Sequence, residues 1–279
     1  MSSRRSRRGF LLSVGAAAAA PTLADTQVSR AGNRYLQERR VLLYECTRKE
    51  IREALEQGSL KAAIVPTGST EQHNEHLAMI HDTASALLVA QKAALQLYPQ
   101  VIVTTPVSIG ISPHWMERKG TLTLRPETFL AVVFDICESL KAHGLKKILI
   151  LNGHGGNVAA IQVALAEVFN ELPGLKVHLE NWWRAPEVEA VFDAAFKEPG
   201  GHADAGETSA ILAIRPDVVR LDRAAFSPDA PEPDFLTVET FLECFPHGVI
   251  GGDPTVGSAQ VGDQALEASA QVCARWLER

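Results

Sequence analysis

Uninterrupted apolar runs alternate along this chain with longer segments that have helical spacing. The runs at 62–66 and 147–151 are apolar at nearly every position rather than at every second one. Strands of this kind are buried on both faces, as in a parallel sheet covered by helices. The repeated order of strand and helix predicts an α/β fold, namely a three-layer α/β/α sandwich with a mainly parallel central sheet.

The expected elements follow from hydrophobic spacing and from local start and stop signals. Thr47 and Glu50 form a capping box, Pro126 begins a helix and Gly144 ends it. Residues 25–45 are expected to form a polar segment that precedes the fold. The segment 224–256 is rich in proline and glycine and is predicted to form a long excursion near the site or at an oligomer contact. Strands are expected at 62–66, 101–104, 147–151 and 176–179, and helices at 47–57, 83–97, 126–142, 158–171, 186–197, 205–214 and 262–277.

The first 24 residues have the composition of an export signal. Arg7 and Arg8 form a twin-arginine sequence, and a weakly hydrophobic, alanine-rich stretch follows. Small or medium-sized residues then precede an expected cleavage site after Ala24. The apolar stretch is shorter than the roughly 20 residues that span a bilayer. We therefore expect a periplasmic or exported protein with no membrane segment in its mature form. The alternative, a basic arm that binds nucleic acid, leaves the apolar run unexplained.

Chain length and net charge limit the number of domains and the kinds of binding partner. The 279 residues suffice for one large domain or two small ones, and the formal net charge is -6. The signal segment carries four arginines and no acid, so its removal takes the charge from -6 to -10. An acidic protein of this kind binds nucleic acid poorly. The four cysteines are widely spaced, so nothing in their spacing demands a disulfide: Cys46, Cys137, Cys244 and Cys273.

Three polar clusters follow predicted strands or begin predicted helices. The first contains Glu71, His73 and, a few residues later, Asp82; the second is Asn152-Gly153-His154-Gly155-Gly156-Asn157; the third is the segment 202–209, with His202 and Glu207. Carboxylate oxygens and imidazole nitrogens together suit zinc, manganese or iron. Parallel strands present their carboxyl ends at one edge, where such sheets bind ligands.

Each cluster taken alone has a simpler explanation. A Glu or His after a strand is usually a solvated loop residue, the glycine-rich segment can be a tight turn, and 202–209 can be helix capping. The occurrence of three His-plus-acid clusters together favours a metal-dependent enzyme.

The same segments, with several others, resemble the creatininase (creatinine amidohydrolase) family from about residue 40 to the end. The resemblance rests on 66–73, Asp82, 110–115, 120–124, 152–157, 202–209 and 248–254. It implies a creatininase-like fold for residues 25–279, a homo-oligomer that is commonly a hexamer, and hydrolysis of a non-peptide C–N bond in a small, cyclic, creatinine-like amide. The attacking group would be a water that bridges two divalent metal ions (Zn, Mn or Fe).

The resemblance also implies roles for individual residues. Glu71, Asp82 and His154 would hold one ion, and His73, Asp82 and Glu207 the other. His202 would be the catalytic acid–base group; the alternative is that it only orients Glu207. The residues that would bind substrate are His76, His114, Trp115, Gly155 and Gly156.

Some positions depart from creatininase itself and leave other functions open. Gly155-Gly156 stands where creatininase has a Tyr-Glu pair, Asn74 replaces a usual glycine, and Lys119 replaces a common proline. The alternatives are hydrolysis of a formamide or short peptide, and a metal-bearing binding protein without turnover. The tryptophans Trp115, Trp182 and Trp183 either wall a planar ligand or pack in the core.

Overall fold

The computed structural model describes residues 40–198, 200–227 and 237–279, so the predicted signal peptide lies outside the described residues. The strands are β1 (Ala62–Thr67), β2 (Val101–Val103), β3 (Lys147–Asn152) and β4 (Lys176–Asn181). The α-helices are α2 (Arg48–Glu56), α3 (His81–Gln96), α4 (Pro126–Ala142), α5 (Val158–Glu171), α6 (Pro186–Ala195), α7 (Ala205–Ile214), α8 (Val238–Cys244) and α9 (Ala259–Glu278). Short 3-10 turns include η2 (Pro113–Trp115) and η3 (Gly155–Asn157).

The sheet among the described residues has four strands in the order β2-β1-β3-β4. Every pairing is parallel, with Val65 opposite Ile150 and Ile150 opposite Leu179. Because the central strands β1 and β3 are neighbours, their carboxyl ends meet at the same edge of the sheet. The segments that follow these two strands therefore start side by side.

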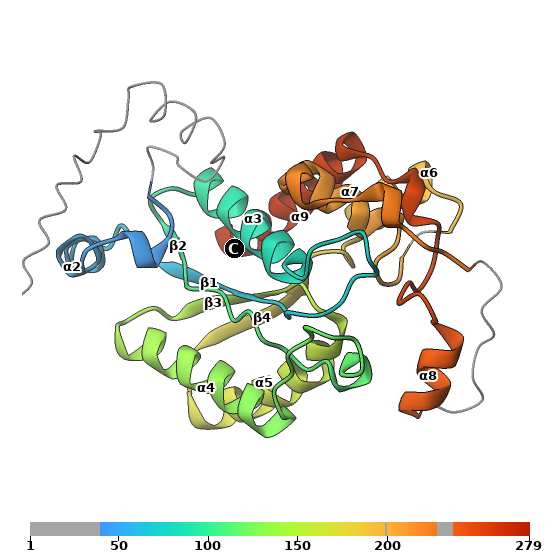
Figure 1. Ribbon diagram of the computed structural model, residues 1–279. Helices are drawn as coiled ribbons and strands as arrows, with labels where there is room; N and C mark the ends of the chain where they lie inside the picture. Colours follow the sequence, from blue (N-terminus) through green and yellow to red (C-terminus); the bar gives the residue numbers. More distant parts are fainter. Residues whose placement is uncertain (1–39, 199, 228–236) are drawn as a thin grey trace, which may run out of the picture. The chain divides into compact units, whose positions relative to one another are not determined.

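Helices cover both faces of the sheet, which confirms the predicted three-layer sandwich (Figure 1). Alternate strand residues such as Val65 and Ile150 pack with Phe129 and Val133 of α4 and with Ile161 of α5. The opposite face is covered by α3 and α9, and α7 packs against both of these helices. Burial on both faces accounts for the uninterrupted apolar runs in the sequence.

Local signals determine several helix ends as expected. The side chain of Thr47 accepts a hydrogen bond from the Glu50 backbone and Glu50 reciprocates, which forms the capping box that begins α2. Pro126 occupies the first turn of α4. Gly144 follows α4 with φ 94°, a left-handed conformation that favours glycine.

Several elements differ from the sequence-based expectation; helix α9, for example, begins at Ala259 rather than at residue 262. Helix α3 begins at His81, two residues before the expected start, so that Asp82 lies in its first turn. The short helix α8 lies within the expected irregular excursion and begins at Val238, directly after Thr237, whose side chain caps it. A run of only seven helical residues has too little periodicity to be recognised in a proline- and glycine-rich segment.

The four cysteines are all free in this structure. Among the described residues, none of the helices combines the length and apolar character that a membrane span requires.

Candidate metal centre

Two asparagines and a glycine bring the polar clusters together at the carboxyl edge of β1 and β3. The Asn157 side-chain amide donates to the Gly68 carbonyl at 3.0 Å, which joins the loop after β3 to the loop after β1. The Thr67 hydroxyl donates to Asn152 at 3.0 Å. A Cβ on Gly153 would lie 2.1 Å from the Asp82 carbonyl oxygen, so only glycine lets the start of α3 approach this closely.

Asp82 lies between two histidines from different loops. Its Oδ1 is 3.1 Å from His73 Nε2, and its Oδ2 is 3.1 Å from His154 Nδ1. Glu207 Oε2 lies 3.4 Å from the same His73 nitrogen, and Glu71 Oε1 lies 3.3 Å from the same His154 nitrogen. The five side chains predicted to bind metal therefore converge, and the two oxygens of Asp82 face histidines from different loops.

Backbone carbonyls determine which nitrogen of each ring faces inward as an acceptor. His73 Nδ1 lies 3.2 Å from the Glu71 carbonyl, and His154 Nε2 lies 3.0 Å from the Ile111 carbonyl. A carbonyl can only accept, so the nitrogen beside it carries the proton. In the neutral ring, the other nitrogen then directs a lone pair at carboxylates. This arrangement requires a positive charge between them, either a second proton on the ring or a metal ion.

Several buried polar atoms that point into this cluster have no hydrogen-bond partner, which suits a metal-binding role. Glu71 Oε2, His73 Nε2 and Asp82 Oδ2 are buried without a hydrogen bond. Burial by itself lowers the pKa of His73, but Asp82 and Glu207 outweigh it and raise that pKa to about 10. The residues present therefore fit divalent cations in both charge and donor type.

Glu207 is held by the start of its own helix. Asp204 caps α7 by accepting a hydrogen bond from the Glu207 backbone at 2.9 Å. In return, Glu207 Oε2 accepts from the Ala203 backbone at 2.6 Å, and Ala203 has φ 51°. Burial, followed by the nearby Glu207 charge, raises the pKa of Asp204 to about 7. These contacts direct the carboxylate of Glu207 toward His73.

His202 is a neutral histidine beside the metal cluster. Its Nε2 lies 2.8 Å from the Gln72 carbonyl, and its Nδ1 lies 3.5 Å from Glu71 Oε1. Burial, followed by the charge of His73, lowers its pKa to about 4. The ring stacks on Trp115 with centroids 5.0 Å apart. The Nδ1 lone pair of His202 is therefore available to accept a proton beside the carboxylates.

A cavity of about 340 Å³ opens onto this cluster. Four of the five residues predicted to bind substrate line it, namely His114, Trp115, Gly155 and Gly156. Trp115 is only 1% exposed and packs against Phe241 as well as His202, so it supports the wall more than it offers surface to a ligand. Trp183 also lines this cavity and a neighbouring one of about 390 Å³, in which Trp182 takes part.

His76 is the predicted substrate-binding residue that is not among the residues lining this cavity. It is fully buried, and its Nε2 lies 2.8 Å from the Thr208 hydroxyl of α7. The chain reverses at Asn74, which has φ 58° and so adopts the left-handed conformation that asparagine tolerates next best to glycine. This turn directs His76 into the protein interior, a direction that sequence spacing does not specify.

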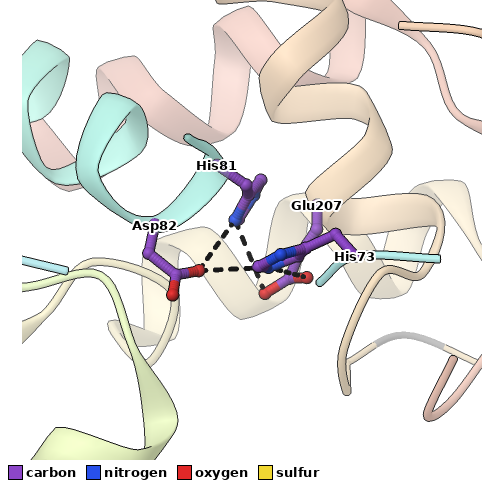
Figure 2. A group of neighbouring side chains, drawn as sticks. All are labelled: His73, His81, Asp82 and Glu207. Atoms are coloured by element: carbon purple, nitrogen blue, oxygen red, sulfur yellow. Dashed lines mark hydrogen bonds and ion pairs between the residues drawn. The ribbon is translucent and has the colours of Figure 1, made fainter. Parts of the chain in front are cut away.

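His81 belongs to the cluster but was not among the predicted site residues. It directly precedes Asp82, is fully buried, and its Nδ1 lies 3.2 Å from Asp82 Oδ1 (Figure 2). Its neighbour Asp82, itself a predicted ligand, was the available signal. The expected helix start at residue 83 left His81 in a loop of undefined direction.

Known proteins resemble this chain in sequence and in fold. The family described as creatininase, creatinine amidohydrolase, matches residues 44–277. A mycofactocin precursor peptide peptidase of Mycobacterium ulcerans is 29% identical over 76% of this chain and 84% of its own length. A creatinine amidohydrolase of Pseudomonas putida is 29% identical over 70% of this chain and 80% of its own length.

Solved structures of creatininases also resemble this chain in fold. A creatininase structure superposes with a TM-score of 0.77 at 25% identity, over 85% of this chain and 96% of that one. A mutant creatininase described as "Zn-Zn type" superposes with a TM-score of 0.74 at 25% identity, over 86% of this chain and 98% of that one.

A His- and carboxylate-rich centre at the carboxyl edge of a parallel sheet is typical of a metal-dependent enzyme. The chain belongs to the creatininase family, as the sequence resemblance predicted. This assignment also confirms the predicted enzyme class, a creatininase-type amidohydrolase that acts on C–N bonds other than peptide bonds.

Proposed function

We propose that this protein is an amidohydrolase that holds two divalent cations and cleaves a C–N bond in a small amide. The observation that supports this most directly is the position of Asp82, whose two oxygens each lie 3.1 Å from the inward nitrogen of a different histidine. Glu71, Asp82 and His154 would hold one cation, and His73, Asp82 and Glu207 the other. The donor set accommodates zinc, manganese or iron.

The chain's own residues have distinct tasks in this proposal. Bound cations would lower the pKa of the attacking water and polarise the amide carbonyl. The cavity walls exclude bulk solvent and orient the amide over Asp82. His202 takes up at Nδ1 the proton that the attacking water loses and delivers it to the departing amide nitrogen, which is a poor leaving group unless it is protonated. The low pKa of His202, about 4, keeps it in the accepting form before the reaction.

The size of the cavity supports a small substrate. A volume of about 340 Å³ lies near the lower end of the range for small-molecule pockets, so the cavity admits a compact cyclic amide. The second candidate, a formylated amine or the end of a short peptide, is favoured by Gly155. A Cβ added there meets nothing within 4 Å, so the cavity is open on that side for a longer amide to extend outward. The peptide-cleaving relative supports the same candidate.

We further propose export through the twin-arginine signal and assembly of the mature chain into a homo-oligomer, a hexamer by family resemblance. Folding before export would allow the cations to be acquired in the cytoplasm. Light scattering on the purified mature protein measures the assembly directly.

The test of the proposed function is metal analysis combined with a panel of amides. Purified protein should contain close to two divalent ions per chain, lose hydrolysis on chelation, and regain it with zinc or manganese. Cyclic amides, formamides and short peptides in parallel assays identify the substrate class. Protein without metal, and without any gain of hydrolysis on addition of either ion, would show the proposal to be wrong.

A further inference from the structure

His81 is a histidine of the centre for which neither the family resemblance nor the comparisons supply a role. It begins α3, and none of its surface is exposed. Its ring packs near His73, with centroids 4.8 Å apart, and near Trp182, with centroids 6.5 Å apart. The side chain therefore has little freedom to turn away from the cluster.

The inward nitrogen of His81 faces the same two carboxylates as His73. His81 Nδ1 lies 3.2 Å from Asp82 Oδ1 and 3.9 Å from Glu207 Oε1 (Figure 2). The two oxygens of Glu207 are divided between the histidines, since its Oε2 faces His73 at 3.4 Å.

These spacings are those of ligands around one four-coordinate ion. Metal–nitrogen and metal–oxygen bonds of about 2.0–2.1 Å in a tetrahedron separate neighbouring ligand atoms by about 3.3 Å. One ligand atom from each of His73, His81, Asp82 and Glu207 lies within 4.8 Å of all the others. Small side-chain adjustments thus bring all four to a common centre.

If His81 binds a metal through Nδ1, its Nε2 carries the proton and needs a hydrogen-bond acceptor. His81 Nε2 lies 3.5 Å from the Ser85 hydroxyl, one turn further along α3. A small movement of the ring toward Ser85 would let this hydroxyl accept a hydrogen bond from Nε2. In the absence of a metal, the same ring donates from Nδ1 to Asp82 instead.

We propose that His81 is the fourth ligand of the cation held by His73, Asp82 and Glu207. This inference rests on the proposed function, because it concerns one half of the same binuclear centre. The two halves then differ, with two imidazoles and two carboxylates in one and one imidazole and two carboxylates around His154 in the other. The nitrogen-rich half is closed and suits tetrahedral zinc, whereas the other half keeps open positions for water and substrate and suits manganese.

The test uses His81→Asn in the full-length protein, loaded with zinc or with cobalt(II). The asparagine amide nitrogen can replace Nδ1 as a hydrogen-bond donor to Asp82, but it cannot replace an imidazole as a ligand. We expect the tighter of the two sites to lose more affinity than the roughly 10–100-fold typical of removing a group that merely orients a ligand. The intense visible absorption of four-coordinate cobalt should be lost as well. His143→Asn, an exposed histidine after α4, is the matched control and should change neither quantity.

Two outcomes would overturn the proposal while leaving the proposed function intact. In the first outcome, wild-type protein binds two ions, and the His81→Asn variant has the same metal affinity and the same cobalt spectrum as wild type. The other is X-ray absorption of wild-type protein with one equivalent of zinc that finds a single imidazole, a measurement that holds even if the variant does not fold. A wild-type protein that binds no ion would contradict the proposed function itself.

Discussion

Asp82 Oδ2 lies 3.1 Å from His154 Nδ1, although Asp82 lies in the first turn of α3 and His154 follows β3. The close approach depends on Gly153, which has no side chain to separate the helix from the strand end. Both side chains are almost completely buried. One carboxylate therefore faces histidines from two loops, and this is the relationship that makes a shared metal site geometrically feasible.

Asp82→Asn should remove metal from both halves of the centre at once. An amide has one oxygen for a cation and no charge, so neither half keeps its carboxylate bridge. We expect loss of bound metal and of amide hydrolysis, with secondary structure retained by circular dichroism. Asp135→Asn, an exposed carboxylate on α4, is the control and should retain both. A variant that still binds two ions would mean that Asp82 does not bridge them.

His202→Ala should lower hydrolysis without removing metal. Loss of a general acid–base group typically costs roughly 10²–10⁴-fold in rate. Metal content by elemental analysis should stay at the wild-type level, with His143→Ala as the control. If metal content falls together with the rate, His202 instead orients Glu207. Unchanged hydrolysis would refute the proton-transfer role, and wild-type protein that holds metal but hydrolyses no amide would indicate a binding protein.

Alanine should be tolerated at one of the two neighbouring glycines after β3 but not at the other. A Cβ at Gly156 would lie 2.1 Å from the Ile111 carbonyl and 2.5 Å from His154 Nε2, whereas one at Gly155 meets nothing within 4 Å. We expect Gly156→Ala to lower the free energy of unfolding by about 1–3 kcal/mol, as overpacking does, and to weaken metal binding. Gly155→Ala should leave both near wild type. Urea unfolding of the two variants compares them, and equal midpoints would contradict the steric argument.

The twin-arginine pair should decide export. Replacing Arg7 and Arg8 by lysine keeps the charge but removes the recognition sequence. We expect the variant to stay uncleaved in the cytoplasm, while wild-type protein is recovered outside it with Asp25 as its first residue. Replacement of the neighbouring pair Arg4 and Arg5 by lysine is the matched control and should leave export unchanged. Export of the Arg7/Arg8 variant at the wild-type rate would disprove the predicted signal.

Features that depend on neighbours in sequence were predictable in detail. Helices α4, α5 and α7 have the expected limits, because their proline, glycine and periodic apolar residues act within one or two turns. The parallel sheet was also predictable, since its strands are uninterrupted apolar runs separated by helical segments.

Features that depend on the direction of a side chain were less predictable. The inclusion of His81, the burial of His76 against Thr208 and the stacking of Trp115 on His202 all follow from turns and contacts between distant segments. A shift of two residues in a helix start rotates a side chain by about half a turn, because each residue adds about 100°. Sequence spacing does not resolve that difference.

The amino-acid sequence alone determined the layers of this protein, the edge of the sheet at which its polar residues gather, and the chemical types of its ligands. Those properties arise from local hydrogen bonding and from hydrophobic periodicity, which neighbouring residues specify. The tertiary structure alone decided which oxygen faces which nitrogen, and which histidines share a carboxylate. These relationships arise where loops from separate strands pack against each other, and packing distances between them are set by every side chain in the interface.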